Sequence, residues 1–131
     1  MALHRLNPEG LFQSQAYSQV VLATGTRLVF IAGQVAVDGS GQVAPDGNFA
    51  DQAKQAFLNV GRALAAAGAR PADVTKLTIY VAGYSPEYLP AIGEARRAVF
   101  ADTLPASTLV GVQSLAQPEF MIEVEATAVL D

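Results

Sequence analysis

The chain contains no cysteine, no tryptophan, one histidine and only two lysines. The missing cysteines exclude disulfides, thiolate metal sites and a cysteine nucleophile. His4 stands alone in a polar N-terminal stretch, so we expect it on a surface tail rather than in a catalytic triad or a metal cluster. The formal net charge is -4 and no basic stripe is present, which argues against a nucleic acid partner.

Several other signals are missing as well. No run reaches the ~18 apolar residues of a membrane span and no apolar signal core opens the chain, so we expect no membrane partner and a cytoplasmic location. Neither a GxxxxGK[ST] loop nor a strand-linked GxGxxG is present, so a nucleotide phosphate site is unsupported. Two acids alone make a poor metal site, and we expect no metal.

What the chain has in excess is apolar surface. Of its 131 residues 51% are hydrophobic and 15% are charged, and the mean hydropathy is +0.29. This length predicts a single domain over residues 1–131. A domain of this size cannot bury so much apolar surface alone, so we expect it to associate with copies of itself.

Alternating and helical periodicities divide the chain into elements. The first ten residues are polar and are expected to be irregular. Two strands, Tyr17–Leu22 and Arg27–Val35, are expected to form a hairpin, and turns at 38–41 and 45–48 enclose a short edge segment. A helix (Phe49–Ala67), a strand (Val74–Gly83) and a second helix (about 86–102) follow. The stretch Pro105–Val129 is expected to form two final strands joined by a short turn. This order predicts an α+β fold, with one mixed sheet and both helices packed on a single face.

Three residues in these elements could be either structural or functional. Gly33 stands where a strand normally carries a side chain, which indicates either a bulge or a place where a ligand approaches the backbone. Arg96 and Arg97 are interpreted as solvated helix charges.

The last strand places two carboxylates on one face. Glu123 and Glu125 alternate with an apolar set that faces the expected core. An ionisable pair in such a strand requires a partner or a function. A glycosidase pair is unsupported, because neighbouring same-face residues of one strand do not flank a sugar. With Tyr80, these acids would lie on the sheet face away from the helices. We expect that face to meet other copies around a symmetry axis, with pockets at the seams.

In this order and spacing, several stretches resemble the RidA (YjgF-like) reactive-intermediate deaminase family over nearly the whole chain. These stretches are Ala16-Tyr17-Ser18-Gln19, Val29 to Gln34, Ala66-Ala67-Gly68-Ala69, Pro105-Ala106 and Ile122 to Ala126. The resemblance implies a homotrimer of chorismate-mutase-like α+β subunits with small-molecule clefts between neighbours. Family enzymes hydrolyse enamines and imines, such as 2-aminoacrylate, to a keto acid and ammonia without a metal or cofactor.

The resemblance also implies roles for particular residues. Tyr17 would line the pocket, the Gly33 backbone would contact substrate, and Glu123 would position or activate the hydrolytic water. A carboxylate in a partly desolvated cleft can pass protons. Glu125 is interpreted as a structural or interface charge.

The chain departs from the family pattern at the pocket. Where family deaminases have an arginine that grips the substrate carboxylate, this chain has Ser107. A hydroxyl offers one neutral hydrogen bond in place of a charged two-pronged contact, a loss of ~2–5 kcal/mol. Gly93 stands where active members often carry asparagine, and Leu109 stands at a cysteine-like position. We therefore do not expect a typical 2-aminoacrylate deaminase.

Three functions are compatible with these residues. One is an enzyme that hydrolyses an enamine, an imine or a related metabolite that needs no carboxylate anchor, with Ser107 and Leu109 lining the pocket. A second is a trimeric binding protein for a metabolite or a protein partner, without turnover. A third, a ribonuclease or translation inhibitor, has been attached to relatives, but the acidic charge speaks against RNA.

Overall fold

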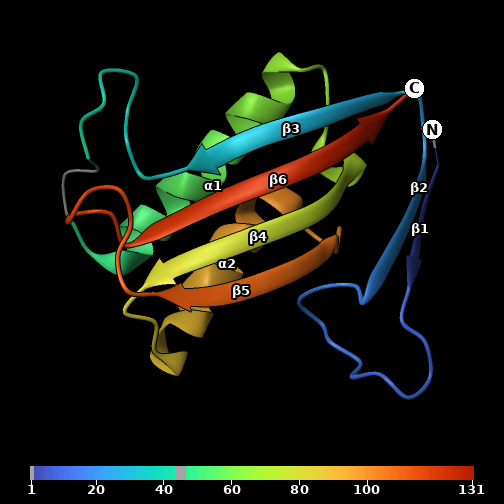
Figure 1. Ribbon diagram of the computed structural model, residues 1–131, viewed down its shortest axis with the longest axis horizontal. Coiled ribbons are helices and arrows are strands. Elements are labelled where there is room, and N and C mark those ends of the chain that lie inside the picture. Colours follow the sequence, from blue (N-terminus) through green and yellow to red (C-terminus); the bar gives the residue numbers. More distant parts are fainter. Residues whose placement is uncertain (1, 44–46) are drawn as a thin grey trace.

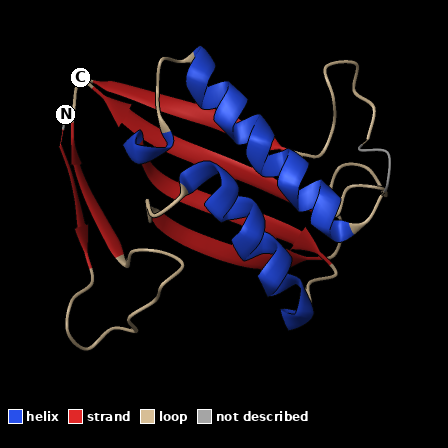
Figure 2. Ribbon diagram, turned by 180° about the vertical axis from the view of Figure 1, so that it is seen from behind, coloured by secondary structure: helices blue, strands red, loops and turns tan. Residues whose placement is uncertain are grey.

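A four-stranded mixed sheet carries both helices on one of its faces, in a computed structural model that describes residues 2–43 and 47–131. Figure 1 shows the sheet in front of the helices, and Figure 2 shows the helices from behind. The strand order is β3-β6-β4-β5, with β6 antiparallel to both neighbours and β4 parallel to β5. The elements of this layer are β3 Arg27–Gln34, α1 Phe49–Ala66, β4 Val74–Ala82, α2 Leu89–Phe100, β5 Ala106–Val112 and β6 Ile122–Leu130. The expected α+β arrangement is confirmed.

The core lies between the sheet and the helices. The apolar residues of β6 that alternate with its carboxylates are buried there, and so are the apolar stripe of α1 and the inward residues of β4. Phe57 of α1 and Phe100 of α2 meet edge to face at the centre of this layer, with ring centroids 6.3 Å apart. The period-2 alternation of β4 and β6 therefore decides which side chains remain on the open face of the sheet.

The expected hairpin of the first two strands is wrong. β3 pairs with β6, whereas β2 (Val20–Thr24) pairs with β1 (Ala2–Leu6) in a separate two-stranded sheet. The first ten residues, expected to be irregular, thus supply a strand, and His4 lies in it, exposed. Figure 1 shows β1 and β2 beside the four-stranded sheet, and a long loop joins these two strands to each other. Sequence-adjacent strands favour a hairpin, but β3 instead pairs with β6, whose apolar face lies in the core.

The final two strands also do not pair with each other, contrary to expectation. β5 and β6 lie on opposite sides of β4, and residues 113–121 connect them around the end of the sheet. β5 runs parallel to β4, which requires the helical crossover through α2. Near the expected edge segment, Val37 and Val43 form an isolated bridge. Residues 45 and 46 of the second expected turn lie outside the described residues.

Helix α1 has the ends that its sequence predicts, whereas α2 begins later than residue 86 and has no side-chain cap. The Asn48 side chain accepts a hydrogen bond from the Asp51 amide at 2.8 Å and caps α1, and Gly68 adopts φ +74 just beyond its C-terminus. Ser85 is followed by a short 3-10 turn, η2 (Pro86–Tyr88), and α2 begins at Leu89. Pro90 therefore occupies the first turn of α2, where its missing amide costs no hydrogen bond.

No helix within the described residues is long and apolar enough to span a membrane. The single domain and the cytoplasmic location remain predictions.

Candidate functional site

The open face of the sheet holds the proposed acid. Glu123 is half-buried and lies opposite Tyr80 in the register of β6 and β4. Glu125 follows on the same face and is exposed. A side-chain hydrogen bond to Glu125 raises the pKa of the Tyr80 hydroxyl, and burial and the charges of both glutamates act in the same direction. Two carboxylates and a protonated phenol thus share one face of the sheet, as the alternation of β6 predicts.

Gly33 and Glu123 lie against each other on this face. The register between β3 and β6 shifts between Ile31 and Gln34, so the predicted bulge is present at Gly33. A Cβ atom added to Gly33 would lie 2.6 Å from Cδ and 2.8 Å from Cγ of Glu123, and closer still to Oε2. A side chain at position 33 would therefore force the proposed acid, Glu123, to move away from the β3 backbone.

Two buried amides of α1 hold the strands on either side of this contact. Gln52 donates to the Glu119 carbonyl at 2.8 Å and accepts from the Met121 amide at 2.9 Å. Asn59 donates to the Val35 carbonyl at 3.0 Å, two residues beyond Gly33. The helix thereby fixes the start of β6 and the end of β3, which positions Glu123 beside Gly33.

A second group of predicted residues lines a cavity of about 160 Å³ on the other side of the sheet, between β5 and α2. Ser107 and Leu109 pair in parallel register with Leu77 and Ile79, which face the helices, so both point to the helix side. The cavity wall is mostly apolar and is formed by Ala16, Tyr17, Ile79, Leu89, Ile92, Gly93, Arg96, Ser107 and Leu109.

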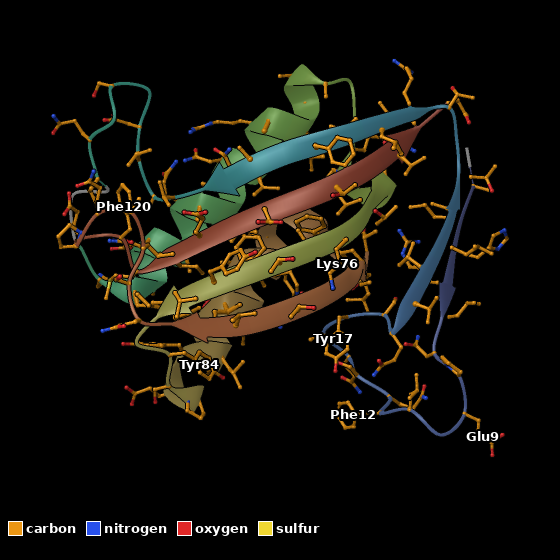
Figure 3. All side chains as sticks on the ribbon, viewed as in Figure 1. Glu9, Phe12, Tyr17, Lys76, Tyr84 and Phe120 are labelled. Carbon is orange, nitrogen blue, oxygen red and sulfur yellow. The ribbon has the colours of Figure 1, made fainter. Side chains whose placement is uncertain are left out.

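The loop that carries Tyr17 is attached to the start of β5. Ser18 is buried, its amide donates to the Pro105 carbonyl at 3.1 Å, and its hydroxyl donates to the Leu104 carbonyl. Ser18 also bridges to Ala106 in parallel, as if extending the sheet by one residue. Figure 3 shows Tyr17 on this loop at the end of the sheet where β5 begins. These bonds bring Tyr17 to the cavity that contains Ser107.

Within one chain, then, the predicted site residues form two groups. Gly33 and Glu123 lie on the open face, while Tyr17, Ser107 and Leu109 lie at the cavity on the helix face. A β-sheet separates the groups, so no single chain brings Glu123 to the cavity.

The interpretation of Arg96 as a solvated charge is wrong. Its side chain is only 6% exposed and lines the cavity with Ser107, whereas Arg97 is exposed as expected. Arg96 falls four residues after Ile92 and four before Phe100, both buried, so helical spacing carries it to the sheet side. The sequence shows this spacing, but the general preference of arginine for solvent led to the opposite prediction.

The buried amides Gln52 and Asn59 were also not predicted. They flank the apolar stripe of α1, one residue before Ala53 and Val60. Their positions on the helix are periodic, but nothing in the sequence identifies the carbonyls that they bind. Those partners lie at residues 119 and 35, beyond the reach of local pattern.

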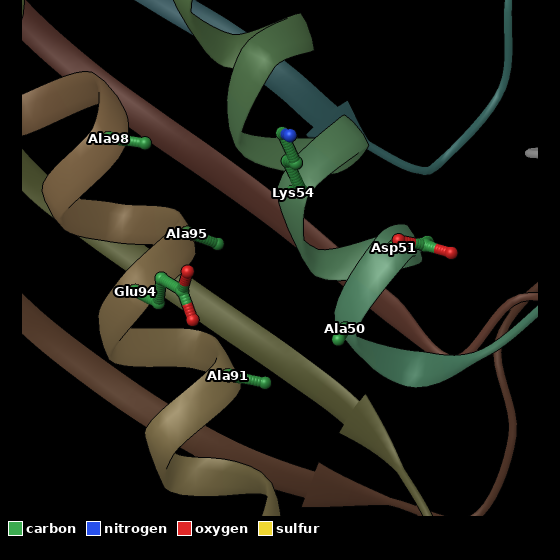
Figure 4. A pocket seen from close by; sticks show the side chains of 7 residues that line it. All are labelled: Ala50, Asp51, Lys54, Ala91, Glu94, Ala95 and Ala98. Atoms are coloured by element: carbon green, nitrogen blue, oxygen red, sulfur yellow. The ribbon is translucent and has the colours of Figure 1, made fainter.

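A further hollow lies between the two helices and has a volume of about 330 Å³. Figure 4 shows Ala91, Ala95, Ala98 and Glu94 on α2 facing Ala50 and Lys54 on α1. Its small side chains allow the helices to approach closely. Among residues 2–43 and 47–131 no group of three or more His, Cys, Asp or Glu side chains could hold a metal ion.

Comparison with known proteins identifies relatives that share both the sequence pattern and this architecture. The model of the endoribonuclease L-PSP family matches residues 10–130. The chain is 37% identical over 115 residues to a 2-iminobutanoate/2-iminopropanoate deaminase of Rattus norvegicus, covering 87% of this chain and 80% of the relative. A deaminase of the same name from Dermatophagoides farinae is 30% identical over 115 residues, covering 88% and 86%.

Solved structures agree with this assignment. YyfB of Yersinia pestis, a protein of unknown function of the conserved Rid family, superposes with a TM-score of 0.92 at 37% identity, over 99% of this chain and 100% of that one. The YjgF gene product of E. coli superposes with a TM-score of 0.67 at 30% identity, over 86% and 87%. The chain therefore belongs to the endoribonuclease L-PSP family, the RidA (YjgF-like) family that its sequence resembles.

Proposed function

We propose that this protein hydrolyses a small imine or enamine to a carbonyl compound and ammonia, without a metal or cofactor. The observation that carries the proposal is the Glu123 carboxylate held against the Gly33 backbone on the open face. Relatives named 2-iminobutanoate/2-iminopropanoate deaminase support this class of reaction.

The proposed chemistry is an addition followed by an elimination. Glu123 accepts a proton from water while the oxygen attacks the carbon of the protonated imine, which forms a neutral carbinolamine. Glu123 then returns this proton to the nitrogen and takes up the proton of the new hydroxyl as the C–N bond breaks, so that ammonia leaves as the carbonyl forms. An enamine enters the same sequence after protonation at carbon. One carboxylate that takes and returns a proton is sufficient for this reaction.

A complete site in this proposal requires more than one copy of the chain. Glu123 and the cavity with Tyr17 lie on opposite sides of the sheet, so a neighbour must supply one of the two groups. The open face is apolar as well as acidic, with Phe30 75% exposed and Leu28 62% exposed on β3. We infer that three copies join through these faces in a homotrimer and that the small molecule binds at the seams.

The alternative is a trimer that binds a metabolite or a protein partner without turnover. Ser107 favours it, because the hydroxyl cannot make the charge-assisted contact of an arginine at this position. A ribonuclease, which the family description suggests, is disfavoured by the net charge of -4 and the two lysines.

A coupled assay tests the proposed reaction. A pyridoxal-phosphate dehydratase generates 2-aminoacrylate or 2-iminobutanoate, and the loss of the imine is followed with and without this protein. We expect acceleration by the wild type and a loss of at least ~100-fold with Glu123→Gln, which cannot take up the proton. Glu125→Gln, on the same face but more exposed to solvent, is the matched control and should retain activity.

The arginine of related deaminases provides the second arm of this assay. If the wild type is inactive, Ser107→Arg is introduced, and activity that then appears would identify the missing contact. Absence of imine hydrolysis by both proteins, with the trimer intact, would leave the binding function as the better account. Acceleration that Glu123→Gln does not reduce would contradict the assigned role of this carboxylate.

A further inference from the structure

Arg96 is a buried cation whose Nη1 atom has no partner. That atom is inaccessible to solvent and makes no hydrogen bond with any described residue. An unpaired buried charge typically costs several kcal/mol, so its retention in the core-facing stripe of a helix requires a compensating partner.

The surroundings of Arg96 increase this cost. Burial lowers the pKa of Arg96, and the neighbouring positive charge of Arg97 lowers it further. The guanidinium nevertheless remains protonated at neutral pH, as arginine does in proteins. The local environment is therefore positive and poor in acceptors, which favours the binding of an anion.

The cavity beside Arg96 defines the size of that anion. Its volume of about 160 Å³ lies below the ~300–1,000 Å³ typical of sites for drug-sized ligands, so the occupant is a small metabolite. The rest of the wall includes Tyr17, Leu109 and the side-chain-free Gly93, which leave room for a short apolar chain and one hydrogen-bonding group. A guanidinium offers a two-pronged contact that matches the geometry of a carboxylate.

We propose that Arg96, from α2, binds the carboxylate of a small 2-imino acid in this cavity, and so takes the part that the family resemblance assigns to an arginine at the position of Ser107. The cation reaches the same pocket from the helix instead of the strand, and Ser107 leaves the space for the carboxylate between them. The substrate class in this inference rests on the proposed function, whereas the anion site itself is inferred from the burial of Arg96. With Arg96 in this role, imines that carry a carboxylate can be substrates, although Ser107 alone cannot bind them by a charged contact.

Binding of a stable product analogue tests this proposal independently of turnover. 2-Oxobutanoate is the keto acid that hydrolysis of 2-iminobutanoate releases, and its neutral amide 2-oxobutanamide has nearly the same shape. We expect calorimetric titration of the wild-type trimer to detect 2-oxobutanoate and to give at least ~10-fold weaker binding of the amide. Arg96→Gln should weaken binding of 2-oxobutanoate by about 10- to 100-fold, the loss expected for a charge-assisted contact.

Three further variants separate a binding role from a structural one. Arg96→Lys keeps the charge and should recover part of the affinity. Arg96→Met removes an unpaired buried charge, so it should lose binding while the Tm stays the same or rises. Arg62→Gln removes an exposed arginine of α1 and is the matched control, with affinity expected within about twofold of wild type.

The outcomes distinguish this proposal from the proposed function. Binding that depends on Arg96 in a protein that hydrolyses no imine would support the anion site and refute the hydrolase. Imine hydrolysis with 2-oxobutanoate affinity unchanged in Arg96→Gln would refute the anion site. An ion pair between copies of the chain is the other role that Arg96 could have. In that case Arg96→Met would lower the Tm and dissociate the oligomer, while Arg96→Lys and Arg96→Gln would leave ligand affinity unchanged. This result would also overturn the proposal.

Discussion

At the scale of single residues, two positions depart from what their local structure favours. Gly33 lacks a side chain where Glu123 approaches the backbone, and Arg96 places a charge where a core residue normally lies. Each breaks a local rule, since glycine weakens a strand and an unpaired charge is costly in a core. Such violations are expected where function outweighs stability.

The Gly33 contact gives a direct prediction. In Gly33→Ala the new methyl group displaces the Glu123 side chain, which is flexible, so the structural cost is small. A carboxylate moved by about 1 Å costs on the order of 100-fold in rate, so we expect kcat/KM for the imine to fall by about 10- to 100-fold with the Tm nearly unchanged. Steady-state kinetics and thermal unfolding measure the two effects.

Gly61→Ala is the matched control for this variant. Gly61 lies in α1, and a Cβ atom there would meet only the Val99 side chain at 3.4 Å. The change should raise stability by ~0.5–1 kcal/mol through helix propensity and leave activity alone. A similar loss of activity in both variants, or unchanged activity in Gly33→Ala, would contradict the assigned contact.

At the scale of elements, the turns and caps show how local sequence positions the strands. The short turn η1 (Pro71–Asp73) connects the end of α1 to β4 and is closed by Asp73, which is buried. Asp73 accepts from the Arg70 amide at 2.8 Å and forms an ion pair with the Arg70 side chain at 3.0 Å. Burial raises the pKa of Asp73, but the hydrogen bonds and the charge of Arg70 together bring it below its ordinary value of 3.8.

This arrangement predicts how stability depends on pH. The pKa of Asp73 is depressed in the folded state, so its contribution is fully present above about pH 4 and is lost as the pH falls through the folded value. Asp73→Ala leaves the Arg70 amide without its acceptor and should lower the free energy of unfolding by ~1–3 kcal/mol at pH 7. Denaturant unfolding at pH 7 and pH 3 should show the gap between the two proteins narrowing at the lower pH. A gap that widens on acidification would contradict the sign.

At the scale of the whole molecule, the open face of the sheet accounts for the excess of apolar residues. Helices cover one face only, as Figure 2 shows, and β3 presents Phe30 and Leu28 on the other. An exposed apolar face of this kind in a chain with mean hydropathy +0.29 indicates association through that face.

Charge introduced into this face should break the assembly. Phe30→Glu places a carboxylate in the expected interface beside the glutamates of β6, so we expect the trimer to dissociate at micromolar concentration. Light scattering coupled to size exclusion measures the mass. Leu58→Glu adds the same charge on α1, in the opposite layer, and should leave the trimer intact. A wild-type protein that runs as a stable monomer would refute the association.

Periodicity in the sequence determined the local structure and the faces of each element. The alternation in β6 sets Glu123 and Glu125 apart from the core, and the apolar stripe of α1 with its Asn48 cap identifies a helix from local sequence alone. These features follow from contacts within a few residues, where pattern is informative.

Only the tertiary structure decided which strands pair, where the loop with Tyr17 lies, and what surrounds Arg96. β3 and β6 are about a hundred residues apart in the chain, and the Ser18 bonds that seat Tyr17 join it to residues 104 and 105. Such contacts depend on the closure of long loops, which local propensity does not encode. The same holds for the candidate site: the pattern of β6 pointed to Glu123, but packing placed it across the sheet from the cavity and buried Arg96 beside Ser107.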